Sequence, residues 1–175
     1  MSTPSAKLLV SVGEKCACVK ISGQANFSSS IDFKVLVNEL LQRGCTYFAL
    51  DLTECALMDS TFLGVLAGIG LKLNASQGSE AGGTMELFNP NERIAELLEN
   101  LGVLHLFKVM HGEVTLPEKT EAQTRTPANP SREEVTQACL EAHETLMNVS
   151  PQNAARFKDV TQFLAENLKK PKANS

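Results

Sequence analysis

The sequence predicts an α/β fold in which helices pack against a mixed β-sheet, followed by a C-terminal helical hairpin. Short runs rich in β-branched and aromatic residues alternate with longer amphipathic segments, which is the pattern of strands that alternate with helices. The first two strand runs, at 7–12 and 16–22, are separated only by Gly13-Glu14-Lys15. They therefore form an antiparallel hairpin, and the sheet cannot be wholly parallel. Two amphipathic stretches after residue 130 predict the final pair of helices.

The predicted first domain covers residues 7–112. After the opening hairpin, Gly23 and Asn26 mark an irregular loop, and Ser30 is the expected cap of a helix that ends near Gln42, before Gly44. The apolar face of that helix is formed by Ile31, Val35, Leu36, Leu40 and Leu41. The elements expected next are a buried strand at 47–52, a helix that opens at 58–60 and runs to 73, a Ser/Gly-rich loop at 76–83, a strand at 84–88, a short helix at 91–100 stopped by Gly102, and a last strand at 106–110.

Residues 113–130 are rich in proline and threonine and poor in apolar residues, so an extended or mobile linker is expected there. Beyond it, Ser131-Arg-Glu-Glu134 has the form of a capping box, and Ser150-Pro151 begins a second helix. The predicted apolar stripes are Val135, Cys139, Ala142 and Leu146 on the first helix and Phe157, Val160, Leu164 and Leu168 on the second. A hairpin over 131–170 is too small to hold a core alone. It must pack on the first domain, on a second copy of the chain as a homodimer, or on a partner.

Composition excludes several classes of function. The chain has 175 residues and a net charge of −4, without a basic face for nucleic acid. No apolar run approaches the ~20 residues that span a bilayer, and the start lacks the features of a secretion signal, so we expect a cytoplasmic protein. The five cysteines contain no Cys-x-x-Cys pair and the three histidines are scattered. We therefore expect reduced thiols, no metal site, no cofactor and no catalytic set.

The strongest candidate for a chemical switch is Ser60. It follows Asp59 at the start of a strongly apolar helix, where we expect it to act as the N-cap with its hydroxyl at the positive end of the helix dipole. A phosphate there would be tolerated by the helix but would place nearly two negative charges beside Asp59. The physics thus favours a switch in binding over a switch in structure.

The helix from Ser60 has an unusual surface, because Gly64 and Gly68 follow at intervals of four residues and line up with it along one ridge. One interpretation is close packing against a neighbouring helix or the sheet. The other is that the ridge lets another protein's backbone approach the Ser60 hydroxyl. Phe62, in the first turn, is expected to be exposed as a contact residue. The opposite side would be buried by Leu63, Leu66, Ala67 and Leu71.

These motifs resemble the STAS domain of bacterial anti-sigma factor antagonists over residues 7–112. The most specific part is Asp51-Leu52 followed by Met58-Asp59-Ser60-Thr61 and Leu63-Gly64-Val65-Leu66. The resemblance implies that the protein captures an anti-sigma factor that is also a serine kinase. It also implies that the kinase phosphorylates Ser60, which follows Asp59, and that a phosphatase reverses this. The family usually has glycine where this chain has Phe62, which bears on kinase access and partner choice.

The leading hypothesis is therefore a non-catalytic regulator of transcription that works by partner switching. Its expected partner-binding residues are Asn26, Asp59, Thr61, Phe62, Gly64 and Gly68. The alternative is a STAS scaffold subunit of a signalling assembly or lipid-transport complex, in which the serine is not phosphorylated. An enzyme is the weakest hypothesis, since Ser60 lacks a Gly-x-Ser-x-Gly elbow and the sequence places no histidine beside it as a base.

Overall fold

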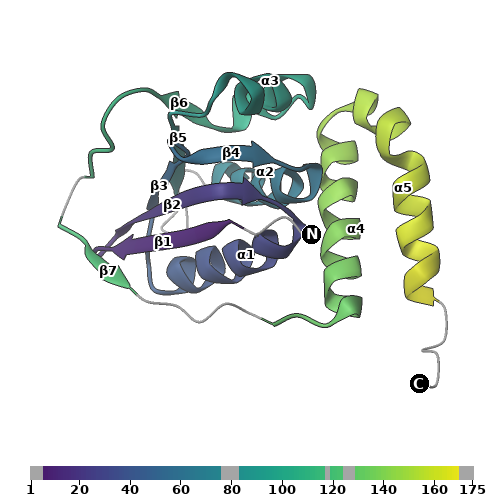
Figure 1. The fold of residues 1–175 in the computed structure, drawn as a ribbon, viewed down its shortest axis with the longest axis horizontal. Coiled ribbons are helices and arrows are strands. Elements are labelled where there is room, and N and C mark those ends of the chain that lie inside the picture. The colour runs from purple at the N-terminus through teal and green to yellow at the C-terminus, as the bar shows by residue number, and fades with distance from the viewer. Residues whose placement is uncertain (1–5, 76–82, 117–118, 124–128, 170–175) are drawn as a thin grey trace.

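The computed structural model describes residues 6–75, 83–116, 119–123 and 129–169. It contains a mixed sheet with helices packed on it and a pair of C-terminal helices (Figure 1). The predicted α/β fold with a helical hairpin is confirmed. Most of the loop predicted at 76–83 lies outside the described residues. In the described part of the chain, no helix is long and apolar enough to cross a membrane.

The sheet runs in the order β6-β5-β3-β2-β1-β7, and β4 pairs with β2 away from that path. Its strands are β1 (Lys7–Val12), β2 (Cys16–Ala25), β3 (Tyr47–Asp51), β4 (Cys55–Met58), β5 (Thr84–Phe88), β6 (Lys108–Met110) and β7 (Glu121–Gln123). β1 is antiparallel to both of its neighbours, β2 and β7, whereas the pairs β2–β3, β2–β4, β3–β5 and β5–β6 are parallel. The opening hairpin thus makes the sheet mixed, as the short turn at 13–15 predicted.

Two strands were not predicted. β4 lies in the stretch expected to be a connection, where it pairs with Gly23, Gln24 and Ala25 of β2, and the register shifts between Gly23 and Gln24. β7 lies within the predicted linker and pairs with Val10, Ser11 and Val12 of β1. All three β7 residues are exposed, so they lack the apolar alternation that marks a strand in sequence.

The helix after β2 begins earlier than predicted. α1 spans Phe27–Gln42, and its N-cap is Asn26, whose side chain accepts hydrogen bonds from the backbone N–H groups of Ser28 and Ser29. Ser29 returns the interaction by accepting from the Asn26 N–H. Ser30, the predicted cap, lies inside the first turn and donates its hydroxyl to the Phe27 carbonyl. The prediction was wrong because Asn26 completes a capping box and the sheet continues to Ala25.

α2 (Ser60–Ala75) packs against α1, α4 and strand β5, and it supplies much of the core. Phe62 is fully buried, with its ring centroid 5.1 Å from that of Phe33 on α1. The expectation that Phe62 is exposed is therefore wrong. Leu71, expected to be buried, is instead 40% exposed. The remaining short helices, α3 (Glu92–Asn100) and the 3₁₀ helix η1 (Leu104–Leu106), lie beyond β5 in the chain.

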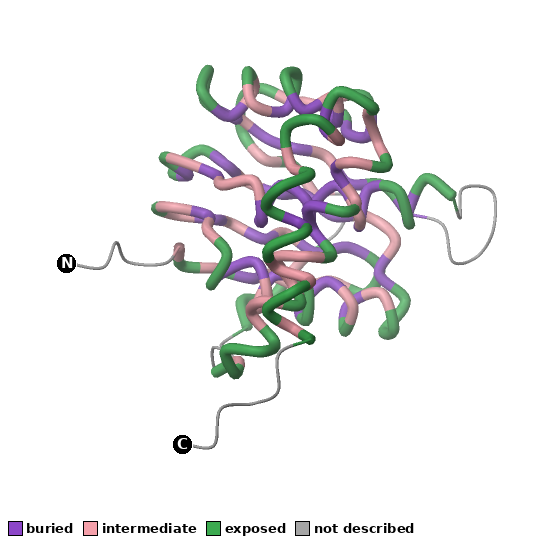
Figure 2. The backbone as a smooth tube through the Cα atoms, turned by 90° about the vertical axis from the view of Figure 1, so that its right-hand side faces the viewer, coloured by how far each residue is buried: buried purple, intermediate pink, exposed green. Residues whose placement is uncertain are grey.

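The C-terminal helices pack on the first domain of their own chain. α4 (Arg132–Val149) lies against α2 and α1, and α5 (Pro151–Lys169) lies along the outer side of α4 (Figure 1). Seen end-on, the pair stands in front of the sheet layer, with much of α5 exposed (Figure 2). The predicted capping box between Ser131 and Glu134 is present. Val160, placed on the apolar stripe of α5, is 43% exposed.

Candidate functional site

Ser60 is the first residue of α2, but it does not cap the helix. Asp59 does: its Oδ1 accepts the Phe62 N–H at 2.8 Å, and its carbonyl accepts the Leu63 N–H at 3.0 Å. A carboxylate is a strong N-cap and adds a favourable charge at the positive end of the dipole. The capping role predicted for Ser60 therefore belongs to Asp59, and the Ser60 side chain is free for another contact.

Asp59 also joins the beginnings of two helices. Its Oδ2 accepts the N–H of Phe27, the first residue of α1, at 2.8 Å, and its own N–H donates to Ala25 at the end of β2. This arrangement brings the predicted site residues Asn26, Asp59 and Ser60 together at one edge of the domain. Burial raises the pKa of Asp59, while the hydrogen bonds from Phe62 and Phe27 oppose that shift.

The Ser60 hydroxyl contacts a residue that the sequence did not point to. Its Oγ lies 2.9 Å from Nε2 of His143 on α4. The other ring nitrogen, Nδ1, lies 2.7 Å from the Cys139 carbonyl. A carbonyl can only accept, so Nδ1 donates to it, and in the tautomer that leaves Nε2 without a hydrogen, Nε2 accepts from the serine hydroxyl. The ring of Phe157 on α5 meets the His143 ring edge-on at 4.9 Å.

This contact corrects one premise of the sequence analysis, because a histidine is placed beside Ser60 as a base would be. His143 is only 7% exposed, and it is covered by Phe157. A signal for it existed: His143 follows Cys139 by four residues and precedes Leu146 by three, so it shares the inward face of α4. The described residues contain no group of three or more side chains suited to hold a metal ion.

The small-residue ridge of α2 is covered by α4. A Cβ added to Gly64 would lie 2.3 Å from the Ala142 carbonyl oxygen, so only glycine allows this approach. At Gly68 the nearest atom would be Thr145 Cγ2, at an ordinary 3.8 Å. Of the two interpretations of the ridge, close packing is the one observed, and the neighbour is a helix of the same chain.

Thr61 completes this interface. It is buried, and its hydroxyl donates to Sγ of Cys139 at 3.6 Å. Burial raises the pKa of the Cys139 thiol, with the Thr61 hydrogen bond acting in the opposite direction. Thr61, Gly64 and Gly68, all predicted to bind a partner, thus contact α4 in this structure.

The sequence family of the STAS domain matches residues 7–116. The chain belongs to the STAS domain family. Its match ends before α4, so the hairpin whose His143 contacts Ser60 lies outside the STAS domain as the family defines it. No curated protein matches the chain.

Solved structures of anti-sigma factor antagonists share the fold of this STAS protein. The antagonist SpoIIAA in its unphosphorylated form is 16% identical, with a TM-score of 0.51 over 62% of this chain and 89% of that one. A putative antagonist from Thermotoga maritima is 22% identical, with a TM-score of 0.51 over 64% and 87% of the two chains. An antagonist from Mycobacterium paratuberculosis is 17% identical, with a TM-score of 0.51 over 63% and 90%. At these identities the likeness concerns the fold.

Proposed function

We propose that this STAS protein is an anti-sigma factor antagonist that works by partner switching in the bacterial cytoplasm. In this proposal it binds an anti-sigma factor that is a serine kinase, phosphorylation of Ser60 weakens that binding, and a phosphatase restores it. The protein itself is not a catalyst. The observation that carries the proposal is the position of the Ser60 hydroxyl at the start of α2, in a helix end already capped by Asp59.

This position suits a phosphate acceptor for a physical reason. Since Asp59 supplies the cap, Ser60 can be modified without removing a hydrogen bond that holds the helix end. The added phosphate brings roughly −1.5 to −2 charges at neutral pH. Placed next to the Asp59 carboxylate, it makes burial of this surface under a partner unfavourable. Structures of antagonists with this fold support the assignment of the partner class.

The alternative is a STAS scaffold subunit in a signalling assembly or a lipid-transport complex. One observation favours it: Ser60 is engaged by His143 of the same chain, so the hydroxyl is not freely presented. Phe62 favours neither function, because its ring is in the core and cannot contact a kinase or a scaffold partner.

The two functions are separated by incubating the protein with ATP and candidate serine-kinase anti-sigma factors, then locating phosphate by peptide mass. We expect phosphate on Ser60 and weaker kinase binding by the phosphorylated protein. Ser60→Ala is the control; it should stay folded because Asp59 keeps the cap, and it should take up no phosphate. Stable kinase binding that phosphorylation leaves unchanged would favour the scaffold.

A further inference from the structure

We propose that α4 is an intramolecular competitor for the ridge of α2, and that a kinase or partner reaches Ser60 only after α4 detaches. The ridge is here defined as Ser60, Gly64 and Gly68. The identity of the binding partner in this inference rests on the proposed function. The masking itself is a property of the chain, and it can be measured without any partner.

The first argument is that α4 occupies the surface of the ridge that a kinase or other binding partner would need to contact. His143 takes the hydrogen bond of the Ser60 hydroxyl, and the backbone of Ala142 fills the space above Gly64. A helix can lie this close to α2 only with a small residue opposite Gly64. A partner helix that docks on the ridge must satisfy the same geometry, so it cannot bind while α4 is in place.

The second argument concerns the polar contacts of α4, which can be exchanged for water. Its link to Thr61 is a hydroxyl–thiol contact, its link to Ser60 is a single hydrogen bond, and its link to α1 is the pair Lys34–Glu141 at 3.2 Å. Both side chains of that pair are about half exposed, so it contributes little. Among the apolar residues of α4, Ala142 and Leu146 are the ones buried in the core.

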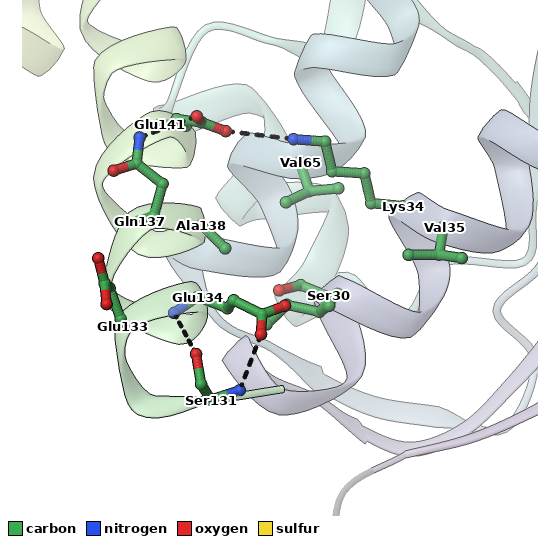
Figure 3. Close-up of a pocket in the computed structure, with 11 residues that line it drawn as sticks. Ser30, Lys34, Val35, Val65, Ser131, Glu133, Glu134, Gln137, Ala138 and Glu141 are labelled. Atoms are coloured by element: carbon green, nitrogen blue, oxygen red, sulfur yellow. Dashed lines mark hydrogen bonds and ion pairs between the residues drawn. The ribbon is translucent and has the colours of Figure 1, made fainter. Parts of the chain in front are cut away.

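The third argument is the fit between α4 and α1. The first half of α4 does not pack closely on α1, and a groove of about 540 Å³ separates them. Figure 3 shows Val65, Val35 and Ala138 around this groove, with the Lys34–Glu141 pair across its far end. The closest backbone approach of α4 to the first domain is at Ala142, over Gly64 of α2. Detachment of α4 therefore breaks few close contacts along α1.

The first experiment uses a pair of glycine variants. Gly64→Ala would drive a methyl group into the Ala142 backbone, whereas Gly68→Ala would meet Thr145 at an ordinary distance. Both changes raise helix propensity equally, so they differ only in their effect on α4. Each is made in a full-length background with Ser60→Cys and Cys139→Ser, and iodoacetamide labelling of the thiol introduced at position 60 is followed by peptide mass.

We expect Gly64→Ala to raise the labelling rate at position 60 by about tenfold or more, because overpacking at a close contact shifts the equilibrium toward the open form. Gly68→Ala should leave the rate unchanged. Equal rates in both variants and in the parent would overturn the proposal, because α4 would then not control access to this position.

The second experiment locks α4 in place. Thr61→Cys puts a second thiol beside Cys139, where the present side-chain contact is 3.6 Å, and oxidation can join the two. With the kinase that phosphorylates the wild-type protein, the oxidised variant should lose phosphorylation at least about tenfold and regain it on reduction. Thr61→Cys with Cys139→Ser is the matched control that cannot be locked.

The two experiments separate this proposal from the function on which it rests. If the locked protein is phosphorylated as fast as the control, α4 is not a competitor, although Ser60 is still a substrate. If no kinase modifies Ser60 but Gly64→Ala alone exposes position 60, the proposed function fails and the masking by α4 is upheld.

Discussion

Asp59 and Ser60 are adjacent but do different things. Asp59 accepts two backbone N–H groups, one at the start of α2 and one at the start of α1. Ser60 makes its side-chain contact with a distant helix through His143. The sequence suggested the opposite division, in which Ser60 capped the helix and Asp59 served recognition. In the structure the carboxylate caps the helix, and the hydroxyl contacts His143 of α4.

Replacing Asp59 should therefore destabilise the domain. Asp59→Ala removes the cap of α2 and leaves the Phe27 N–H without its acceptor. We expect a loss of about 2–3 kcal/mol in the free energy of unfolding, measured by urea denaturation. Asp59→Asn is the control: it keeps one side-chain oxygen for the cap and should lose about half as much. An Asp59→Ala protein as stable as wild type would show that recognition is the main role of this residue.

Phe62 provides a test of the hydrophobic core. Its ring is fully buried and packs against Phe33. Phe62→Ala should lower the free energy of unfolding by about 3–5 kcal/mol, since a large cavity is left in the core. Phe163→Ala is the matched control, because that ring is 61% exposed on α5. It should change stability by no more than about 0.5 kcal/mol. Similar losses from both changes would contradict the burial of Phe62.

At the scale of elements, the sequence predicted the helices and strands whose formation depends on residues close together in the chain. The strands with apolar alternation, the capping box at Ser131 and the helix stop before Gly102 needed only neighbours in sequence. β4 and β7 depend on pairing with β2 and β1, so no local signal marked them. Phe62 was misplaced for the same reason: its burial is decided by Phe33 on α1. His143 was missed because only tertiary packing brings it to Ser60.

The turn between α4 and α5 is fixed to the first domain by Asn153. Its Nδ2 donates to the carbonyls of Leu101 and Leu146, both at 2.8 Å, from a position that is 1% exposed. Asn153→Ala would leave both acceptors buried without this donor. We expect the free energy of unfolding, either of the whole protein or of the hairpin alone, to fall by about 2–3 kcal/mol. Gln152→Ala, at the exposed position next to Asn153, is the control, and it should leave the free energy of unfolding unchanged in the same urea denaturation. An unchanged Asn153→Ala protein would show that other contacts fix this turn.

For the whole molecule, the two parts of the chain differ in how they are held. The STAS domain has a continuous core between its sheet and the helices α1 and α2. The helical pair adds Ala142 and Leu146 to that core and otherwise contacts it through polar groups and partly buried side chains. Regions with fewer buried apolar contacts open at a lower free-energy cost than the rest of a protein.

Hydrogen–deuterium exchange of the intact wild-type protein should therefore show α4 exchanging before α1 and α2. We expect the amides of α4 around Ala142 and His143 to exchange together, as one cooperative unit, while those around Phe33 and Leu66 exchange only on global unfolding. The reason is that α4 adds only Ala142 and Leu146 to the buried core, whereas separating α1 from α2 exposes the fully buried Phe33–Phe62 pair. If α4 and α2 instead exchanged at the same rate across increasing urea, the chain would unfold as a single unit. In that case α4 would be a permanent part of the domain, and the Ser60 hydroxyl would leave His143 only when the whole protein unfolds.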